Sequence, residues 1–143
     1  MVKPLWAAST LVAALVLANP LAAQQSAPAS PSAAPNVKRI PLQRFDVPGT
    51  AFEAVIGIAE IAPSVAIGRH THPGPESGYV IEGGFELLID GEPPRLLKAG
   101  DSYKVPPGAI HDAKAGPQGA KVIATYVVEK GQPLAAAAPA APQ

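Results

Sequence analysis

The amino-acid sequence predicts a small all-β domain, and three of its features lead to this prediction. Short apolar stretches alternate with turns that contain Gly or Pro, at the spacing expected of a β-sandwich or β-barrel. The segment 121–129 concentrates Val, Ile, Thr and Tyr, the residue types that favour strands. No segment combines a convincing helical period with capping residues. The chain of 143 residues has room for one such domain.

The predicted strands follow one another closely. They cover residues 37–46, 51–61, 64–71, 79–82, 85–90, 95–98, 102–105, 110–113 and 121–129. Gly83-Gly84 is expected to be the turn of a hairpin between 79–82 and 85–90, and Asp90-Gly91 marks the next turn. Pro41 and Pro48 suit an edge strand better than a central one, so 37–46 is placed at an edge.

The first 23 residues have the pattern of a secretory signal. Lys3 supplies a positive start, and residues 5–17 form an apolar run that is too short to span a bilayer comfortably. Leu21-Ala22-Ala23 offers a small-residue cleavage point, while an uncleaved membrane anchor is the alternative. In both cases the folded domain is expected to be exported, and after cleavage it would be periplasmic or secreted with no membrane attachment.

Two further segments have compositions that do not form a packed core. Residues 24–36 are an Ala, Pro, Ser and Gln linker without charge, and residues 132–143 repeat the Ala and Pro bias. Both are expected to be disordered. The folded domain is therefore predicted to cover residues 37–131.

Composition excludes several classes of function. Eleven basic residues balance eleven acidic ones, so no nucleic-acid partner is expected. The chain has no cysteine, which rules out thiol catalysis, disulfides and thiolate metal sites.

The stretch around His70, His72 and Glu76 carries the strongest functional signal. Side chains alternate along a strand, so the two histidines point the same way, and the Pro-containing bend after them lets Glu76 return to that side. His111, the third histidine of the chain, follows a Pro-Pro-Gly turn. Imidazoles and a carboxylate are ligands for one divalent transition metal, either Fe, Mn, Ni, Zn or Cu. Isolated surface histidines are the alternative.

Two motifs resemble those of the cupin superfamily. The pattern H-x-H-x3-E-x6-G runs from His70 to Gly83, and the pattern G-x5-P-x-G-x2-H runs from Gly100 to His111. Ser64 stands where the first motif opens with Gly, and Ala115 stands where the second closes with Asn. Both departures concern turn residues. The resemblance covers nearly all of 37–131 and is typical of small single-domain bacterial cupins.

The resemblance implies a fold, a ligand set and a mode of assembly. The fold is a double-stranded β-helix, also called a jelly-roll barrel. One metal would be held by His70, His72, Glu76 and His111, and a homodimer is a common state of such domains. The turn glycines would have a structural role.

The site allows three kinds of function on a small-molecule ligand or substrate. The first is a metal-dependent oxygenase of the quercetinase type, for which Glu76 is the candidate catalytic residue if it detaches from the metal. The others are a non-catalytic metal or ligand binder and a sugar isomerase or epimerase. A Ser-His-Asp hydrolase is excluded, because all three histidines are assigned to the metal. The polar neighbours are expected at the surface or behind the ligands: Tyr79, Tyr103, Lys104 and Asp112.

Overall fold

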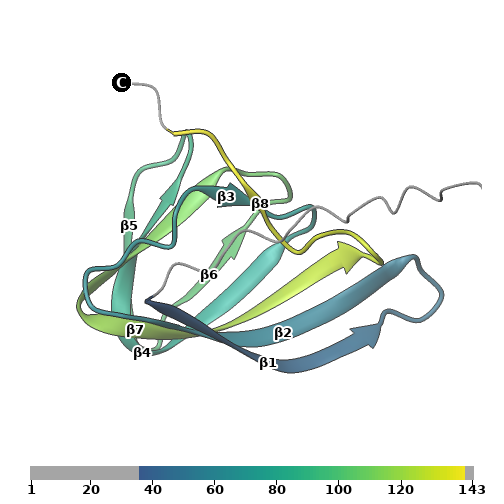
Figure 1. The fold of residues 1–143 in the computed structure, drawn as a ribbon, viewed down its shortest axis with the longest axis horizontal. Helices are drawn as coiled ribbons and strands as arrows, with labels where there is room; N and C mark the ends of the chain where they lie inside the picture. Colours follow the sequence, from purple (N-terminus) through teal and green to yellow (C-terminus); the bar gives the residue numbers. More distant parts are fainter. Residues whose placement is uncertain (1–35, 141–143) are drawn as a thin grey trace, which may run out of the picture.

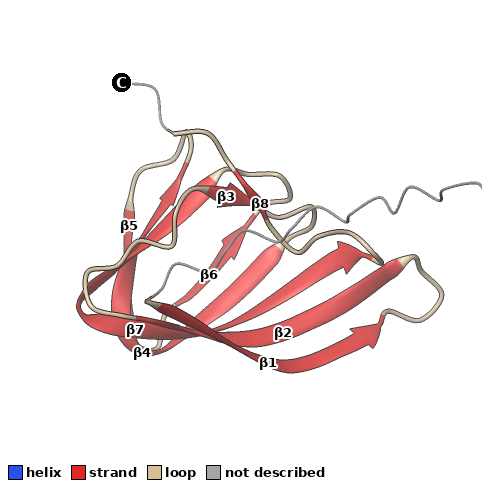
Figure 2. Cartoon of the chain, viewed as in Figure 1, coloured by secondary structure: helices blue, strands red, loops and turns tan. Residues whose placement is uncertain are grey.

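The computed structural model describes residues 36–140, in which two long antiparallel strands form the centre of the fold. These strands are β4 (Glu76–Ile89) and β7 (His111–Glu129). They pair along most of their length, and each bends part of the way along (Figures 1 and 2). The predicted signal segment and nearly all of the predicted linker lie outside the described residues.

One half of this ribbon belongs to a first layer of the sheet. The second half of β7 pairs with β2 (Phe52–Ile61), which pairs in turn with β1 (Val37–Asp46). The first half of β4 pairs with β6 (Ser102–Val105). Strand β1 has no partner other than β2 among the described strands, so its predicted place at an edge is correct.

The other half of the ribbon belongs to a second layer. The second half of β4 pairs with β5 (Arg95–Lys98), and the start of β7 pairs with β3 (His70–Thr71). The short strand β8 (Ala136–Ala137) adds to β3. Strands β4 and β7 run through both layers and bend between them. The two layers therefore face each other across the interior (Figure 1). The prediction of an all-β jelly-roll barrel is confirmed.

Gly83-Gly84 does not form the predicted hairpin turn. Strand β4 continues through it, with register shifts against β7 on both sides of Gly83, and this is where the ribbon passes from one layer to the other. Gly83 has a φ of 67°, and a side chain there would collide with the carbonyl of Gly119 on β7. The turn signal therefore marks a bend that two adjacent strands make together. For the same reason the predicted strands 110–113 and 121–129 are parts of one strand.

The apolar core lies between the layers and comes from alternate positions of the strands. Its members include Val80, Leu87 and Val105, which are almost fully buried. Burying one such side chain contributes about 1.5–3 kcal/mol. The remaining larger members are Val37, Ile61, Phe85, Ile89, Leu97, Tyr103 and Val122.

Gly78 makes room in this core for an aromatic ring. Gly78 on β4 pairs with Tyr103 on β6, and a methyl group at Gly78 would overlap the Tyr103 ring. The ring packs edge-on against Phe85, with 5.4 Å between the ring centroids. The missing side chain thus lets Tyr103 lie flat over the strand and point its hydroxyl into the interior.

Ser64, which replaces the opening glycine of the first motif, adopts the backbone conformation that favours glycine. Its φ is 60°, the only positive value of a non-Gly residue in the part of the chain that the structure describes. Its amide donates to the carbonyl of Gly116 over 3.0 Å, which holds this conformation in place. The motif position therefore keeps its left-handed geometry although the residue has changed.

The C-terminal segment departs from the prediction of a disordered tail. Residues 132–140 are described, and the part that contains β8 lies alongside β3 (Figure 1). We call Gln132–Pro139 the strap. Its order comes from backbone hydrogen bonds, which composition does not reveal. Residues 141–143 lie outside the described part.

Between residues 36 and 140, no helix is long and apolar enough to cross a membrane.

Replacing Ser64 by Gly is expected to raise the free energy of unfolding by about 0.5–1 kcal/mol. Glycine avoids the cost of about 1–2 kcal/mol that other residues incur in this region, but it loses more entropy on folding. Urea denaturation measures the change. Ser102→Gly, in the regular strand β6, is the control and should be destabilising. A less stable Ser64→Gly protein would contradict the assignment.

Gly78→Ala is expected to destabilise the protein by about 1–3 kcal/mol, because the added methyl displaces the Tyr103 ring. The same substitution should cost much less in a Tyr103→Ala background, in which there is no ring to displace. Thermal denaturation of the two single variants and the double variant gives the coupling. Equal costs in both backgrounds would show that the ring is not the obstacle.

Candidate metal centre

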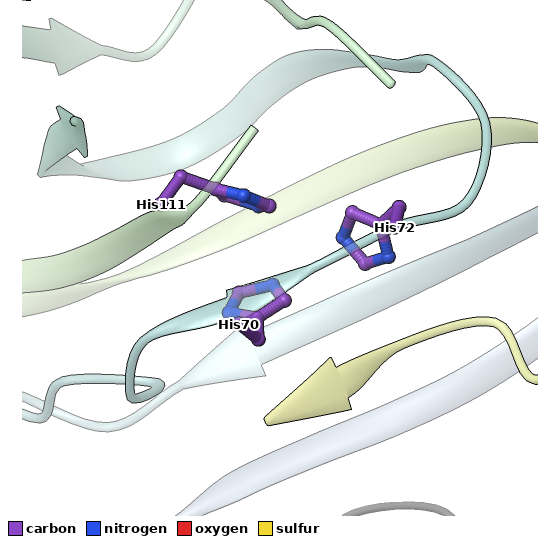
Figure 3. A group of neighbouring side chains, drawn as sticks. All are labelled: His70, His72 and His111. Carbon is purple, nitrogen blue, oxygen red and sulfur yellow. The ribbon is translucent and has the colours of Figure 1, made fainter. Parts of the chain in front are cut away.

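The three histidines meet where β3 lies beside the start of β7. His70 on β3 pairs across the sheet with His111, the first residue of β7, and His72 follows two positions after His70. The ring centroids are 4.1–5.1 Å apart, and the rings turn toward one another (Figure 3). One ring nitrogen from each lies within 4.8 Å of the others. The structure therefore brings together residues far apart in sequence, as the predicted metal site requires.

Backbone carbonyls hold one nitrogen of each ring. The Nδ1 atom of His70 lies 2.7 Å from the carbonyl of Gly68, and that of His111 lies 3.0 Å from the carbonyl of Ala109. The Nδ1 atom of His72 lies 2.7 Å from the carbonyl of Leu134. A carbonyl oxygen can only accept, so each Nδ1 carries the ring proton. Each Nε2 lone pair is then left for another partner, the arrangement usual for metal-bound imidazole.

Glu76, the first residue of β4, supplies a carboxylate to the same point. Its Oε2 lies 3.2 Å from Nε2 of His72 and 3.4 Å from Nε2 of His111. Its Oε1 accepts a hydrogen bond of 2.8 Å from the hydroxyl of Tyr103 and a longer one of 3.5 Å from Tyr126. One oxygen is thus held by the two tyrosines, while the other faces the histidines.

The charges of these groups depend on one another. Burial and the nearby His111 lower the pKa of His70 to about 4, so this ring is neutral at pH 7. Burial would raise the pKa of Glu76, but interactions with His111 and His72 outweigh it and leave the pKa well below its ordinary value. The pKa of His111 is raised, because its interaction with Glu76 exceeds the effect of burial. The buried carboxylate therefore favours positive charge beside the Nε2 atoms.

The residues fit a metal cation on two observations. Nε2 of His72 is buried, has no hydrogen-bond partner among residues 36–140, and lies 3.2 Å from Oε2 of Glu76. Such an unsatisfied atom costs about 1–3 kcal/mol unless something binds it. The spacings of 3.2 and 3.4 Å match neighbouring ligands of one ion, for which the bonds are about 2.0–2.2 Å long. His70, His72, Glu76 and His111 could thus hold a divalent transition metal.

The tyrosines and Asp112 stabilise this arrangement from behind. Burial and the charge of Glu76 raise the pKa values of Tyr103 and Tyr126, so both hydroxyls remain protonated donors. The Oδ1 atom of Asp112 accepts from the amides of Gly68 and Ala113, over 2.9 and 2.7 Å. It thereby fixes the turn whose carbonyl holds His70. Tyr103 and Asp112 thus lie behind the candidate ligands, one of the two locations predicted for them from the sequence.

Tyr126 was not singled out by the sequence. It lies near the end of β7 and pairs with Glu76 across the ribbon, and the centroid of its ring is 4.7 Å from that of His72. Its only sequence signal is that it is a polar aromatic residue in the strand-forming stretch 121–129. The register that places it opposite Glu76 spans 50 residues and cannot be read from the local pattern.

A cavity of about 450 Å³ opens over the site. The ligand side chains and the two tyrosines line one part of it, and most of the remaining wall is aliphatic. Arg39 and Arg44 of β1 contribute charged groups to the lining. The aliphatic wall includes Ile40, Leu42, Val55, Ile56, Ile58, Ile67, Leu87 and Leu134.

Comparison with known proteins found a relative in sequence and several similar structures. A dimethylsulfoniopropionate lyase, DddW of Ruegeria pomeroyi, is 37% identical over 67 residues, which are 47% of this chain and 43% of the lyase. The chain therefore spans less than half of this curated relative. KdgF from Halomonas has a similar structure, with a TM-score of 0.56 and 23% identity over 68% of this chain and 84% of KdgF. An oxalate oxidase structure gives the same TM-score and identity over 72% of this chain and 56% of its own.

These two structural likenesses show the fold alone. The family is shown by the match of residues 57–131, more than half of the chain, to the cupin domain model. This range contains both histidine motifs and the strands from the second half of β2 to β7. The resemblance noted from the two motifs is confirmed, and the chain belongs to the cupin family.

Proposed function

We propose that this chain is a metal-dependent enzyme that acts on a small, largely apolar organic molecule. His70, His72, Glu76 and His111 would be the protein ligands of one divalent transition metal. The observation that carries the proposal is the meeting of three histidine ring nitrogens and a carboxylate oxygen beneath a largely aliphatic cavity. Export by residues 1–23 and assembly into a homodimer remain predictions.

An oxygenase is the activity that we favour, as the sequence led us to expect. Four protein ligands leave positions on a six-coordinate metal at which a chelating substrate or dioxygen can bind. The aliphatic walls exclude water from this region and favour a substrate with an apolar body, such as a phenol or a β-diketone. They also count against a sugar isomerase, whose substrate needs a polar pocket.

Glu76 is the residue best placed to hold a proton during the reaction. Its Oε1 is fixed by Tyr103 and Tyr126, while its Oε2 is directed at the site. The protonated phenols stabilise the carboxylate in the orientation that it has in the resting protein. If Oε2 detaches from the metal position, it would be free to hold, within the cavity, a proton taken from a bound substrate.

A lyase is the second candidate. It is supported by the 37% identity to a dimethylsulfoniopropionate lyase over 67 residues. A lyase breaks its substrate without consuming oxygen, so the two candidates differ in a quantity that can be measured directly. A binder without turnover is the remaining alternative.

The purified protein is expected to contain about one transition metal ion per chain, and His72→Ala should remove most of it. This substitution leaves the other ligands but opens the buried side of the site. Metal analysis by inductively coupled plasma mass spectrometry measures the content. Thr71→Ala is the matched control, because Thr71 alternates away from the histidines along the strand. Full occupancy of the His72→Ala protein would refute the ligand assignment.

The metal-loaded protein is expected to consume oxygen with one member of a panel of phenols and β-diketones. An oxygen electrode follows the uptake, and the metal-stripped protein is the control. Tyr103→Phe should lower the rate about tenfold, because Glu76 loses its shorter hydrogen bond. Anaerobic breakdown of dimethylsulfoniopropionate would instead support the lyase. Tight binding without turnover of either substrate class would support the binder and contradict both enzymes.

A further inference from the structure

The strap, Gln132–Pro139, lies against the strand that carries two of the candidate ligands. Ala136 and Ala137 pair with Thr71 and His70, and the amide of Ala138 donates to the carbonyl of Arg69 over 2.9 Å. Figure 1 shows the strap crossing from the end of β7 to the side of β3. In the close-up, β8 passes beside His70 and His72 (Figure 3).

His72 differs from the other two histidines in the source of its carbonyl partner. His70 and His111 each use a carbonyl two residues away, so their own local turns hold them. His72 uses the carbonyl of Leu134, 62 residues away on the strap, at 2.7 Å. His72 is only 4% exposed, and Leu134 and Ala135 of the strap line the same cavity as this histidine. One of the three histidines therefore depends on a segment outside the matched cupin domain.

Arg69 fastens the far end of the strap. Its two terminal nitrogens donate to the two oxygens of Asp90 over 2.7 and 2.6 Å, and its Nε donates to the carbonyl of Pro139 over 2.8 Å. Such a bidentate ion pair fixes the guanidinium plane. Because Asp90 holds the two terminal nitrogens, the Nε–H of Arg69 points in a fixed direction, toward the carbonyl of Pro139. The strap itself carries no charged side chain with which it could form ion pairs.

We propose that the strap is a positioning element of the metal site, and that Arg69 is the residue that holds it in place. The Leu134 carbonyl keeps the proton of His72 on Nδ1 and directs Nε2 at the metal position. Leu134 and Ala135 also close one wall of the cavity. Without the strap, His72 would exchange its fixed acceptor for water and its ring would be free to turn. This inference rests on the proposed function only in requiring that the site binds a metal.

Removal of the strap is expected to lower the affinity of the site for a metal ion. Outer partners of metal-bound histidines typically contribute 10- to 100-fold to metal affinity. A chain that ends at Gly131 should therefore bind Zn²⁺ about 10- to 100-fold more weakly than the full chain. Arg69→Ala in the full chain should weaken binding about 3- to 10-fold, because the backbone pairing of β8 remains.

The experiment measures the dissociation constant for Zn²⁺ by competition with a chromophoric chelator. The full chain is compared with the Gly131 truncation, Arg69→Ala, Arg69→Lys and Lys38→Ala. Arg69→Lys keeps the charge but cannot donate to Asp90 and Pro139 in the same way, so it should resemble Arg69→Ala. Lys38→Ala removes another surface ion pair, with Glu60, and should bind like the full chain.

A second readout separates positioning from a general loss of stability. Nitrogen-15 spectra of the imidazoles in the full chain should show the His72 proton on Nδ1 and slow to exchange with water. In Arg69→Ala that proton should exchange faster, while those of His70 and His111 remain unchanged. This measurement uses a full-length variant, so it remains decisive if the truncated chain does not fold.

The possible outcomes differ clearly. Failure of the full chain to bind Zn²⁺ would overturn the proposed function and the strap's role together. Normal binding by the full chain with unchanged affinity in Arg69→Ala and the truncation would overturn the strap's role alone. Equal acceleration of exchange at all three histidines would show that Arg69 only stabilises the fold.

Discussion

The need to satisfy buried polar groups controls the architecture of this site. Two buried imidazoles, the half-buried His70 and a buried carboxylate lie beside a largely apolar core, where an unpaired polar atom is costly. Backbone carbonyls take the three Nδ1 protons, and two tyrosine hydroxyls occupy one carboxylate oxygen. One ring nitrogen of each histidine and the other carboxylate oxygen then meet at one point. The site is therefore defined as much by the hydrogen bonds that surround it as by its four candidate ligands.

The β-sheet delivers these groups from three directions. His70 and His111 are adjacent because β3 pairs with β7, and Glu76 arrives from β4 on the other side of the interior. The same cross-strand pairing shapes the core. Gly78 on β4 has no side chain, so the phenol of Tyr103 on β6 can pass over it and reach Glu76. Packing and the site are thus built from the same cross-strand pairs.

Local pattern was sufficient to predict the fold class and to single out four residues that the structure brings together. The alternation of His70 and His72 and the spacing to Glu76 and His111 are properties of short segments, and they survive in the structure. Three features depend on distant pairing and could not be predicted. Gly83 is a bend because Gly119 lies against it, Tyr126 reaches Glu76 through the β4–β7 register, and the strap is ordered by β3. Ser64 is intermediate, since the motif marked the position but only the backbone shows why glycine suits it.

The hydrogen bond from Arg69 to the strap makes His72 sensitive to changes near Pro139. Pro139, which accepts from Arg69, is only five residues from Leu134, whose carbonyl holds His72. A bulky group introduced directly after Pro139 would therefore begin close to the contacts that hold His72. Bulk or tension there would be transmitted to a candidate metal ligand, so tags are better placed at the amino end of the folded domain.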